Sequence, residues 1–108
     1  MSRKYDIILK APASTQYIEE TLSSVLLKIA QIVGNDGIVL GHIKAIAQTE
    51  DGTLALSVTR VGSVDVKYLG KWSELGSAER FTASINVLSL LEPEEDITTL
   101  LNIEEQFA

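Results

Sequence analysis

Cysteine is missing from the 108 residues of this chain, and histidine occurs only once. Without cysteine the protein has no disulfide framework, no thiolate metal ligand and no cysteine nucleophile. A single histidine leaves too few of the preferred ligands for a zinc site, and no motif indicates another cofactor. The lack of cysteine also suits a reducing compartment, so we expect a cytoplasmic protein.

Long apolar runs and clusters of basic residues are missing as well. No apolar stretch approaches the ~20 residues that a membrane-spanning helix requires, and the N-terminus lacks the pattern of a signal peptide. Lysine and arginine total 9 and are scattered, whereas aspartate and glutamate total 15, which gives a net charge of −6. Since nucleic acids and anionic membranes are bound by clustered positive charge, we expect neither as a partner.

Acidic residues gather near the C-terminus, where six lie between positions 92 and 105 without a basic residue. Their spacing lacks the alternating ligands and the glycine of a calcium-binding loop. Pro93 fits the first turn of a helix, and Glu94 and Glu95 would complement the positive end of the helix dipole. We therefore predict a solvated C-terminal helix here rather than a metal site.

The most regular pattern in the chain predicts a long helix from Thr15 to Val33. Ser14 or Thr15 can cap its N-terminus, because a hydroxyl can accept hydrogen bonds from the free N–H groups of the first turn. Gly34 follows the last apolar position and suits a helix end. The apolar residues recur at helical spacing along one stripe, which indicates packing against a sheet. They are Ile18, Leu22, Val25, Leu26, Ile29, Ile32 and Val33.

Residues 38–61 read as two strands joined by a tight turn at Asp51-Gly52, a pair favoured where the backbone needs positive φ. This turn would place Ala47 opposite Leu56, and because directly opposed residues share a face, it divides all the side chains between two faces. The apolar face would hold Ile43, Ala45, Ala47, Leu54, Leu56 and Val58. The second face would hold His42, Lys44, Ile46, Gln48, Ala55, Ser57, Thr59 and Val61.

Three further segments have the pattern of strands: residues 4–10, which Pro12 would end, residues 64–71 and residues 80–91. Residues 72–79 read as a loop around Gly76. The element order is then β-α-β-β-β-β-α, in a single domain over residues 1–108. We predict an α+β fold, a two-layer sandwich in which a mainly antiparallel sheet of about five strands packs one face against the long N-terminal helix.

A candidate site lies on the second face of the hairpin. His42 and Lys44 are two residues apart on one strand, so both project from the same face. The expected register would bring Thr59 opposite Lys44, with Ser57 two residues away on the same strand. The candidate ligand-binding residues are therefore His42, Lys44, Ser57 and Thr59, whose donors could bind a carboxylate or a phosphate. The alternative is that Lys44 extends into solvent and His42 packs at a strand end.

The sequence is compatible with three functions. The leading hypothesis is a non-catalytic interaction or accessory module that acts through its open sheet face and associates with itself or with another protein, because that face combines small, semi-polar residues with few charges. The second hypothesis is a small-anion or nucleotide-binding protein that uses the candidate site. The third is a small hydrolase or isomerase with His42 as its base, although no glycine-framed nucleophile accompanies this histidine.

Overall fold

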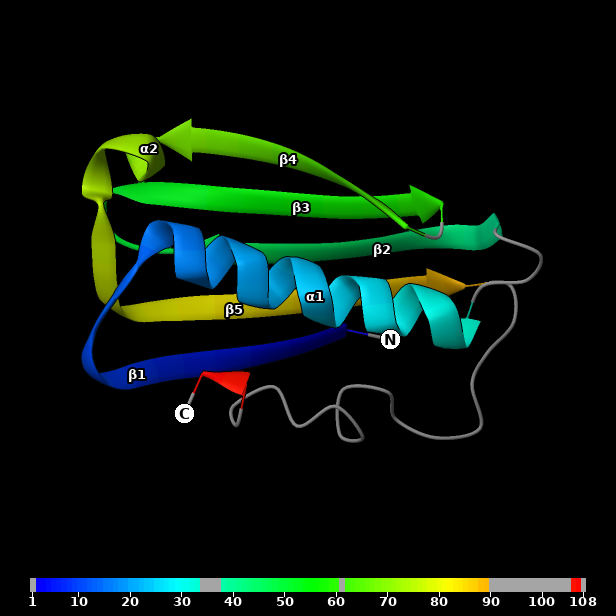
Figure 1. Ribbon diagram of the computed structural model, residues 1–108, viewed down its shortest axis with the longest axis horizontal. Helices are drawn as coiled ribbons and strands as arrows, with labels where there is room; N and C mark the ends of the chain where they lie inside the picture. The colour runs from blue at the N-terminus through cyan, green and yellow to red at the C-terminus, as the bar shows by residue number, and fades with distance from the viewer. Residues whose placement is uncertain (1, 34–37, 61, 90–105, 108) are drawn as a thin grey trace.

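The computed structural model describes residues 2–33, 38–60, 62–89 and 106–107. The elements are β1 (Ser2–Ser14), α1 (Thr15–Val33), β2 (Ile38–Gln48), β3 (Gly52–Arg60), β4 (Ser63–Gly70), α2 (Trp72–Leu75) and β5 (Ser77–Ser89). The five strands form one sheet in the order β1-β5-β2-β3-β4, and every neighbouring pair is antiparallel. Helix α1 lies along one face of this sheet (Figure 1). The predicted α+β two-layer sandwich is confirmed.

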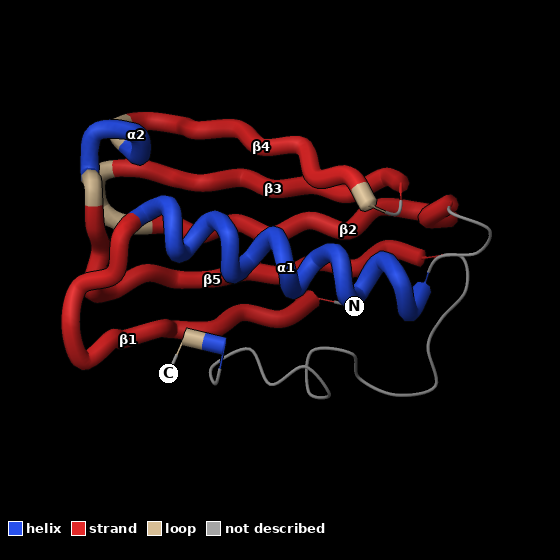
Figure 2. Tube along the Cα trace, in the orientation of Figure 1, coloured by secondary structure: helices blue, strands red, loops and turns tan. Residues whose placement is uncertain are grey.

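The sheet is assembled from two parts of the chain. The chain leaves β1 through α1 and returns as β2, and β5 later enters between these two strands. Because β1 and β2 are both antiparallel to β5, they run parallel to each other, and a helical crossover is the usual connection for such a pair. The consecutive strands β2, β3 and β4 extend the sheet on the other side (Figure 2). The β4 strand and the β1 strand are therefore the two edges.

Helix α1 begins where the sequence predicts it. The backbone N–H of Tyr17 donates to the Ser14 hydroxyl at 3.0 Å, which is the capping bond expected of a serine just before a helix. The apolar stripe of the helix is buried against the sheet, apart from Ile32, which is 52% exposed. The buried members are Ile18, Leu22, Val25, Leu26, Ile29, Ala30 and Val33. Gly34, the expected helix end, lies outside the described residues.

The covered face of the sheet supplies the other half of the core. Alternate residues of β2, β3 and β5 point toward α1 and are buried: Ile43, Ala45, Ala47, Leu54, Leu56, Val58, Phe81, Ala83, Ile85 and Val87. Each fully buried large aliphatic side chain contributes about 1.5–3 kcal/mol to folding relative to exposure in water. Both predicted faces of the hairpin are therefore confirmed wherever the structure describes them.

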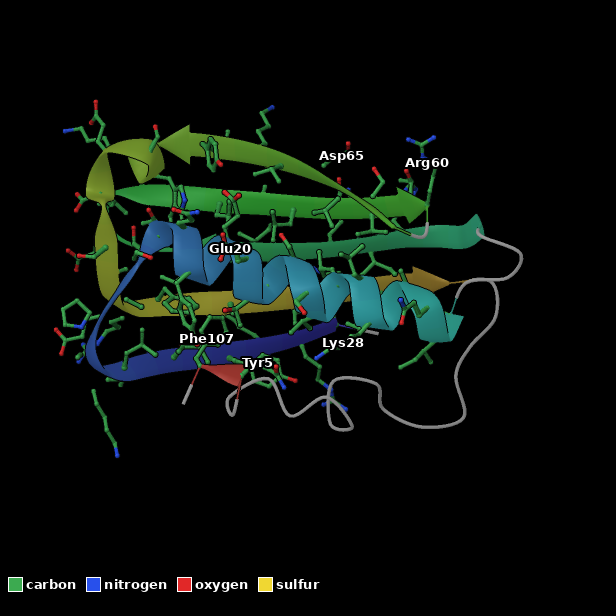
Figure 3. The ribbon with its side chains drawn as sticks, viewed as in Figure 1. Tyr5, Glu20, Lys28, Arg60, Asp65 and Phe107 are labelled. Atoms are coloured by element: carbon green, nitrogen blue, oxygen red, sulfur yellow. The ribbon has the colours of Figure 1, made fainter. Side chains whose placement is uncertain are left out.

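The C-terminal end of the described chain closes the core beside β1. Phe107 is buried and meets Phe81 edge to face, with ring centroids 5.2 Å apart (Figure 3). Its ring also meets Tyr17 edge to face at 6.4 Å, and the Tyr17 hydroxyl lies 3.4 Å from the backbone oxygen of Gln106. The predicted C-terminal helix otherwise falls on residues outside the described ranges.

The predicted register of the β2-β3 hairpin is wrong by two residues. Ala47 lies opposite Leu54, not Leu56, and the turn is centred on Glu50 and Asp51. The reason lies in Thr49, whose hydroxyl accepts from the N–H of Gly52 at 3.0 Å, while its own N–H donates to the Gly52 carbonyl at 2.9 Å. Because a shift of two residues preserves the side-chain alternation, the faces are unchanged.

Gly52 has a different role from the one expected. Its φ is not positive; instead, a Cβ at this position would lie 2.2 Å from the backbone nitrogen of Trp72. The predicted loop over residues 72–79 is also wrong at both ends, because Trp72, which is only 1% exposed, begins the short helix α2, and β5 already begins at Ser77. Glycine at position 52 therefore permits the close approach that lets the Trp72 indole cover one end of the core.

The first strand is longer than predicted. β1 continues past Pro12 to Ser14, and its pairing with β5 shifts register between Ile8 and Ala13. A bulge at an edge strand accommodates proline because no N–H is required there for a ladder bond.

Candidate functional site

The face of the sheet opposite α1 carries no other element of the described chain and is called the open face below. The cross-strand registers arrange its side chains in rows that run from β1 through β5, β2 and β3 to β4. The three central rows are Asp6-Thr82-Gln48-Thr53-Leu69, Lys4-Ser84-Ile46-Ala55-Lys67 and Ser2-Asn86-Lys44-Ser57-Asp65. All of these side chains are exposed or partly exposed. The open face is therefore a continuous surface built by five strands.

Charge on the open face is concentrated at its two edges. Across the three central rows, the three inner strands carry nine side chains, and Lys44 alone among them is charged. The two edge strands carry six side chains in the same rows, and four of these are charged: Lys4, Asp6, Asp65 and Lys67. Figure 3 shows Asp65 on β4, at the edge of the sheet. The centre of the face is thus small and nearly uncharged, with a charged rim.

Ile46 is the largest apolar side chain at this centre. It is 36% exposed and lies between Ser84 on β5 and Ala55 on β3. Both neighbours are short, so the isoleucine stands above the surface around it. A branched apolar side chain surrounded by small ones is a shape that can interdigitate with a second sheet, since the side chains of packed sheets fill a gap of about 10 Å.

The four candidate ligand-binding residues all belong to β2 and β3 and lie on the open face. Lys44 lies directly opposite Ser57, and not opposite Thr59 as expected, because of the two-residue shift in register. His42 faces Leu88 across the β2-β5 pair. His42, Lys44 and Thr59 are exposed, and Ser57 is partly buried. The structure therefore brings Lys44 and Ser57 together, each with a second candidate residue two positions along its own strand.

Lys44 and Ser57 offer an ammonium and a hydroxyl side by side, which is a donor set for an oxyanion. In the same row, Asn86 lies on the other side of Lys44, and Asp65 lies beyond Ser57. An amide donor next to the lysine favours an anion, whereas the carboxylate of Asp65 would repel one. The arrangement is thus a shallow polar row rather than an enclosed pocket.

A separate open hollow of about 810 Å³ lies where β1 and β5 meet the β2-β3 turn. Its lining includes Asp6, Glu50, Asp51 and Glu79, with Arg80 as the basic residue, and none of the four candidate residues lines it. No group of three or more histidine, aspartate or glutamate side chains in the described ranges is arranged to hold a metal ion. The hollow is acidic, and its geometry does not form a metal centre.

A side-chain contact that the sequence did not reveal joins α1 to β4. The Tyr68 hydroxyl donates to the carboxylate of Glu19, and this hydrogen bond raises the pKa of the tyrosine above its ordinary value of 10.0. Burial and the negative charge of Glu19 act in the same direction. The two residues are 49 positions apart, so only the tertiary structure could show that they meet.

In comparisons with known proteins, no family model matches the chain, and searches of curated proteins and of solved structures give no match. Among the described helices, none has the length and apolar character needed to cross a membrane. The function must therefore be argued from the surface itself.

Proposed function

We propose that this chain is a non-catalytic interaction or accessory module that acts through its open sheet face and associates with a second copy of itself. The observation that carries the proposal is the distribution of charge, with a nearly uncharged centre on β5, β2 and β3 and a charged rim on β1 and β4. Protein interfaces are depleted of charge at their core and polar at their rim. The open face has the same arrangement.

Packing of two open faces would follow ordinary sheet-on-sheet geometry. A two-fold axis in the plane between the sheets makes the same patch serve both copies, so it must be complementary to itself. Ile46 protrudes, while Ala55 and Ser84 beside it leave space, and this relief lets one copy receive the isoleucine of the other. Lys44 is the one charged residue near the centre, and its long side chain can extend toward the rim.

We place this module in the cytoplasm, and the support is compositional. The chain contains no cysteine, which is typical of proteins that do not depend on an oxidising compartment.

The test is sedimentation equilibrium of the wild-type protein and of Ile46→Glu. Burial of an unpaired carboxylate at the centre of an interface is costly, so we expect the variant to lose face-to-face association by at least about tenfold in dissociation constant. Its folding stability should change by no more than about 1 kcal/mol, because the side chain is 36% exposed on the open face and lies outside the core.

Ile32→Glu is the matched control. Ile32 is also exposed, at 52%, but lies on α1 on the other side of the molecule. The same chemical change there should leave association unchanged. A wild-type protein that stays monomeric up to about 1 mM would contradict the self-association, as would equal effects of the two substitutions.

The second candidate function is binding of a small anion or nucleotide by His42, Lys44, Ser57 and Thr59. The direct opposition of Lys44 and Ser57 favours it, since directly opposed residues of an antiparallel pair project their side chains from the same face within reach of each other. Phosphate should then raise the melting temperature of the wild-type protein, and Lys44→Ala should abolish the increase. Lys28→Ala, an exposed lysine on α1, is the control that should retain it. An unchanged melting temperature in phosphate would contradict this function.

A further inference from the structure

The edge strand β4 carries several exposed apolar side chains. In the described chain, β4 pairs with β3 on one side and with no strand on the other. Three of the large exposed apolar side chains lie on this one strand: Val66 at 41%, Tyr68 at 50% and Leu69 at 43% exposed. An edge that combines free backbone groups with exposed apolar side chains can accept another strand.

The backbone of β4 presents its free groups at defined residues. The N–H of Lys71 donates to the carbonyl of Asp51 at 2.9 Å, at the start of the β3-β4 ladder. In antiparallel pairing, alternate residues direct both N–H and C=O toward the same neighbour. Asp65, Lys67 and Leu69 therefore direct these groups toward β3. Residues 64, 66 and 68 direct theirs outward, to the open edge.

This alternation limits how a second β4 strand can pair. In an antiparallel pair related by a two-fold axis, the outward residues must oppose one another, and one such register places Val66 opposite Val66 of the second copy. In that register Asp65 lies opposite Lys67 of the second copy, and the symmetry repeats this pair of opposite charges. On the helix-facing side, Val64 then lies opposite Tyr68 of the second copy.

The neighbouring registers lack this complementarity. A shift in one direction brings Asp65 opposite Asp65 of the second copy, and a shift in the other brings Lys67 opposite Lys67. Like charges directly opposite each other in a sheet are destabilising, whereas opposite charges and apolar pairs stabilise it. The charges of Asp65 and Lys67 thus favour the register centred on Val66 over the two neighbouring registers, while the helix-facing side offers apolar pairs.

We infer that β4 is a second interface between copies of this chain, in which two β4 strands pair edge to edge about a two-fold axis through Val66. The axis is perpendicular to the sheet, so the two open faces lie on the same side of one continuous ten-stranded sheet. This interface is formed by the backbone edge of β4, and its charged pairs belong to the rim of the open face, so it is tested apart from the proposed function in a background that blocks the centre of that face. Edge pairing of a single strand buries little area, so the association is of the weak class.

Charge reversal tests this pairing directly, by sedimentation equilibrium at up to about 1 mM protein. Asp65→Lys places lysine opposite lysine, and Lys67→Asp places aspartate opposite aspartate. Each should weaken edge pairing by about tenfold or more. The double variant D65K/K67D restores opposite charges and should pair as the wild type does. An equimolar mixture of the two single variants should form a heterodimer, because every facing pair in it is complementary.

The two single variants change the net charge in opposite directions, so an effect of net charge alone would strengthen one association and weaken the other. Lys28→Asp on α1 makes the same charge change as Lys67→Asp away from β4 and should leave pairing intact. The series is repeated with Ile46→Glu added to each protein, which blocks the open face so that edge pairing is measured alone.

A dimer that persists in Ile46→Glu and is lost in both charge reversals supports the inference. It is overturned if Ile46→Glu is monomeric throughout this range, if the mixture sediments as monomers, or if either reversal dimerises as tightly as its parent.

Discussion

The two faces of the sheet are built from the same strands and differ in almost every other respect. Leu56 and Ile85 are buried beneath α1, whereas their chain neighbours Ser57 and Ser84 remain partly exposed on the open face. One backbone alternation fixes both sets of residues. The difference teaches that the stability of this fold rests on one face. Substitutions on the other face can therefore change contacts with partners while leaving the fold intact.

The largest expected difference between the two faces is in the free energy of unfolding, and two adjacent residues of β3 can show it. Leu56→Ala should lower the free energy of unfolding by about 3 kcal/mol, because it leaves a cavity under α1. Ser57→Ala, one residue further along, should change it by less than about 0.5 kcal/mol. Urea denaturation of both variants measures the difference. Similar losses for the two would contradict the division of the sheet into a structural face and a free face.

Substitution of Gly52 should destabilise the protein nearly as much as substitution of Leu56, although glycine carries no side chain. Its substitution by alanine places a Cβ 2.2 Å from the backbone nitrogen of Trp72, so the chain must move where the indole covers the core. Overpacking of this kind costs about 1–3 kcal/mol. Thr53→Ala, which alters the next residue on the open face, should cost much less. Thermal unfolding followed by Trp72 fluorescence tests both, and an unperturbed Gly52→Ala variant would exclude the close approach.

A smaller effect is expected at the start of the helix that covers the structural face. Ser14→Ala removes the acceptor for the N–H of Tyr17 and should destabilise the protein by about 1 kcal/mol. Ser24→Ala is a matched control, because Ser24 is exposed within α1, where alanine is the better helix former. The capping role would be refuted if both variants unfolded at the same denaturant concentration.

The smallest effect concerns the contact between α1 and the edge of the sheet. Tyr68 should titrate above its ordinary pKa of 10.0, since Glu19 accepts a hydrogen bond from the protonated hydroxyl. Because the pKa is raised in the folded state, the hydrogen bond between Tyr68 and Glu19 stabilises the fold fully below pH 10. Its stabilisation declines as the pH rises through the raised pKa. Glu19→Gln should bring the pKa back down. Ultraviolet titration of the wild-type protein and of Glu19→Gln gives the pKa of Tyr68, once the titration curve of Tyr68→Phe has been subtracted from each. Equal pKa values in the two proteins would contradict the contact.

Much of the division between faces could be predicted from the sequence. Alternation in β2, β3 and β5 predicted the correct face for residues 42–48, 53–59 and 81–87, and the serine cap predicted the start of α1. These features depend on residues close together in the chain. The register of the hairpin could not be predicted from Asp51-Gly52, because the Thr49 hydroxyl, and not a positive φ at glycine, organises the turn.

The candidate site was predictable only in part, for a related reason. That Lys44 and Ser57 share a face follows from the local pattern, but their direct opposition depends on the register. The charged rim depends on the strand order, which brings β5 between β1 and β2 and leaves β4 at an edge. No local pattern encodes this order. The meeting of Tyr68 with Glu19 and the burial of Trp72 likewise depend on contacts between distant segments.

The most direct test of the division between the faces is an amide NMR spectrum of the labelled wild-type protein, recorded from about 0.05 to 1 mM. If the open face is the contact surface, the signals that shift with concentration should include Ile46, Ala55 and Ser57. Signals of the buried residues of α1 should remain in place. Spectra that do not change with concentration, or changes confined to α1 or to β4, would contradict the assignment of the open face as the surface through which this protein associates.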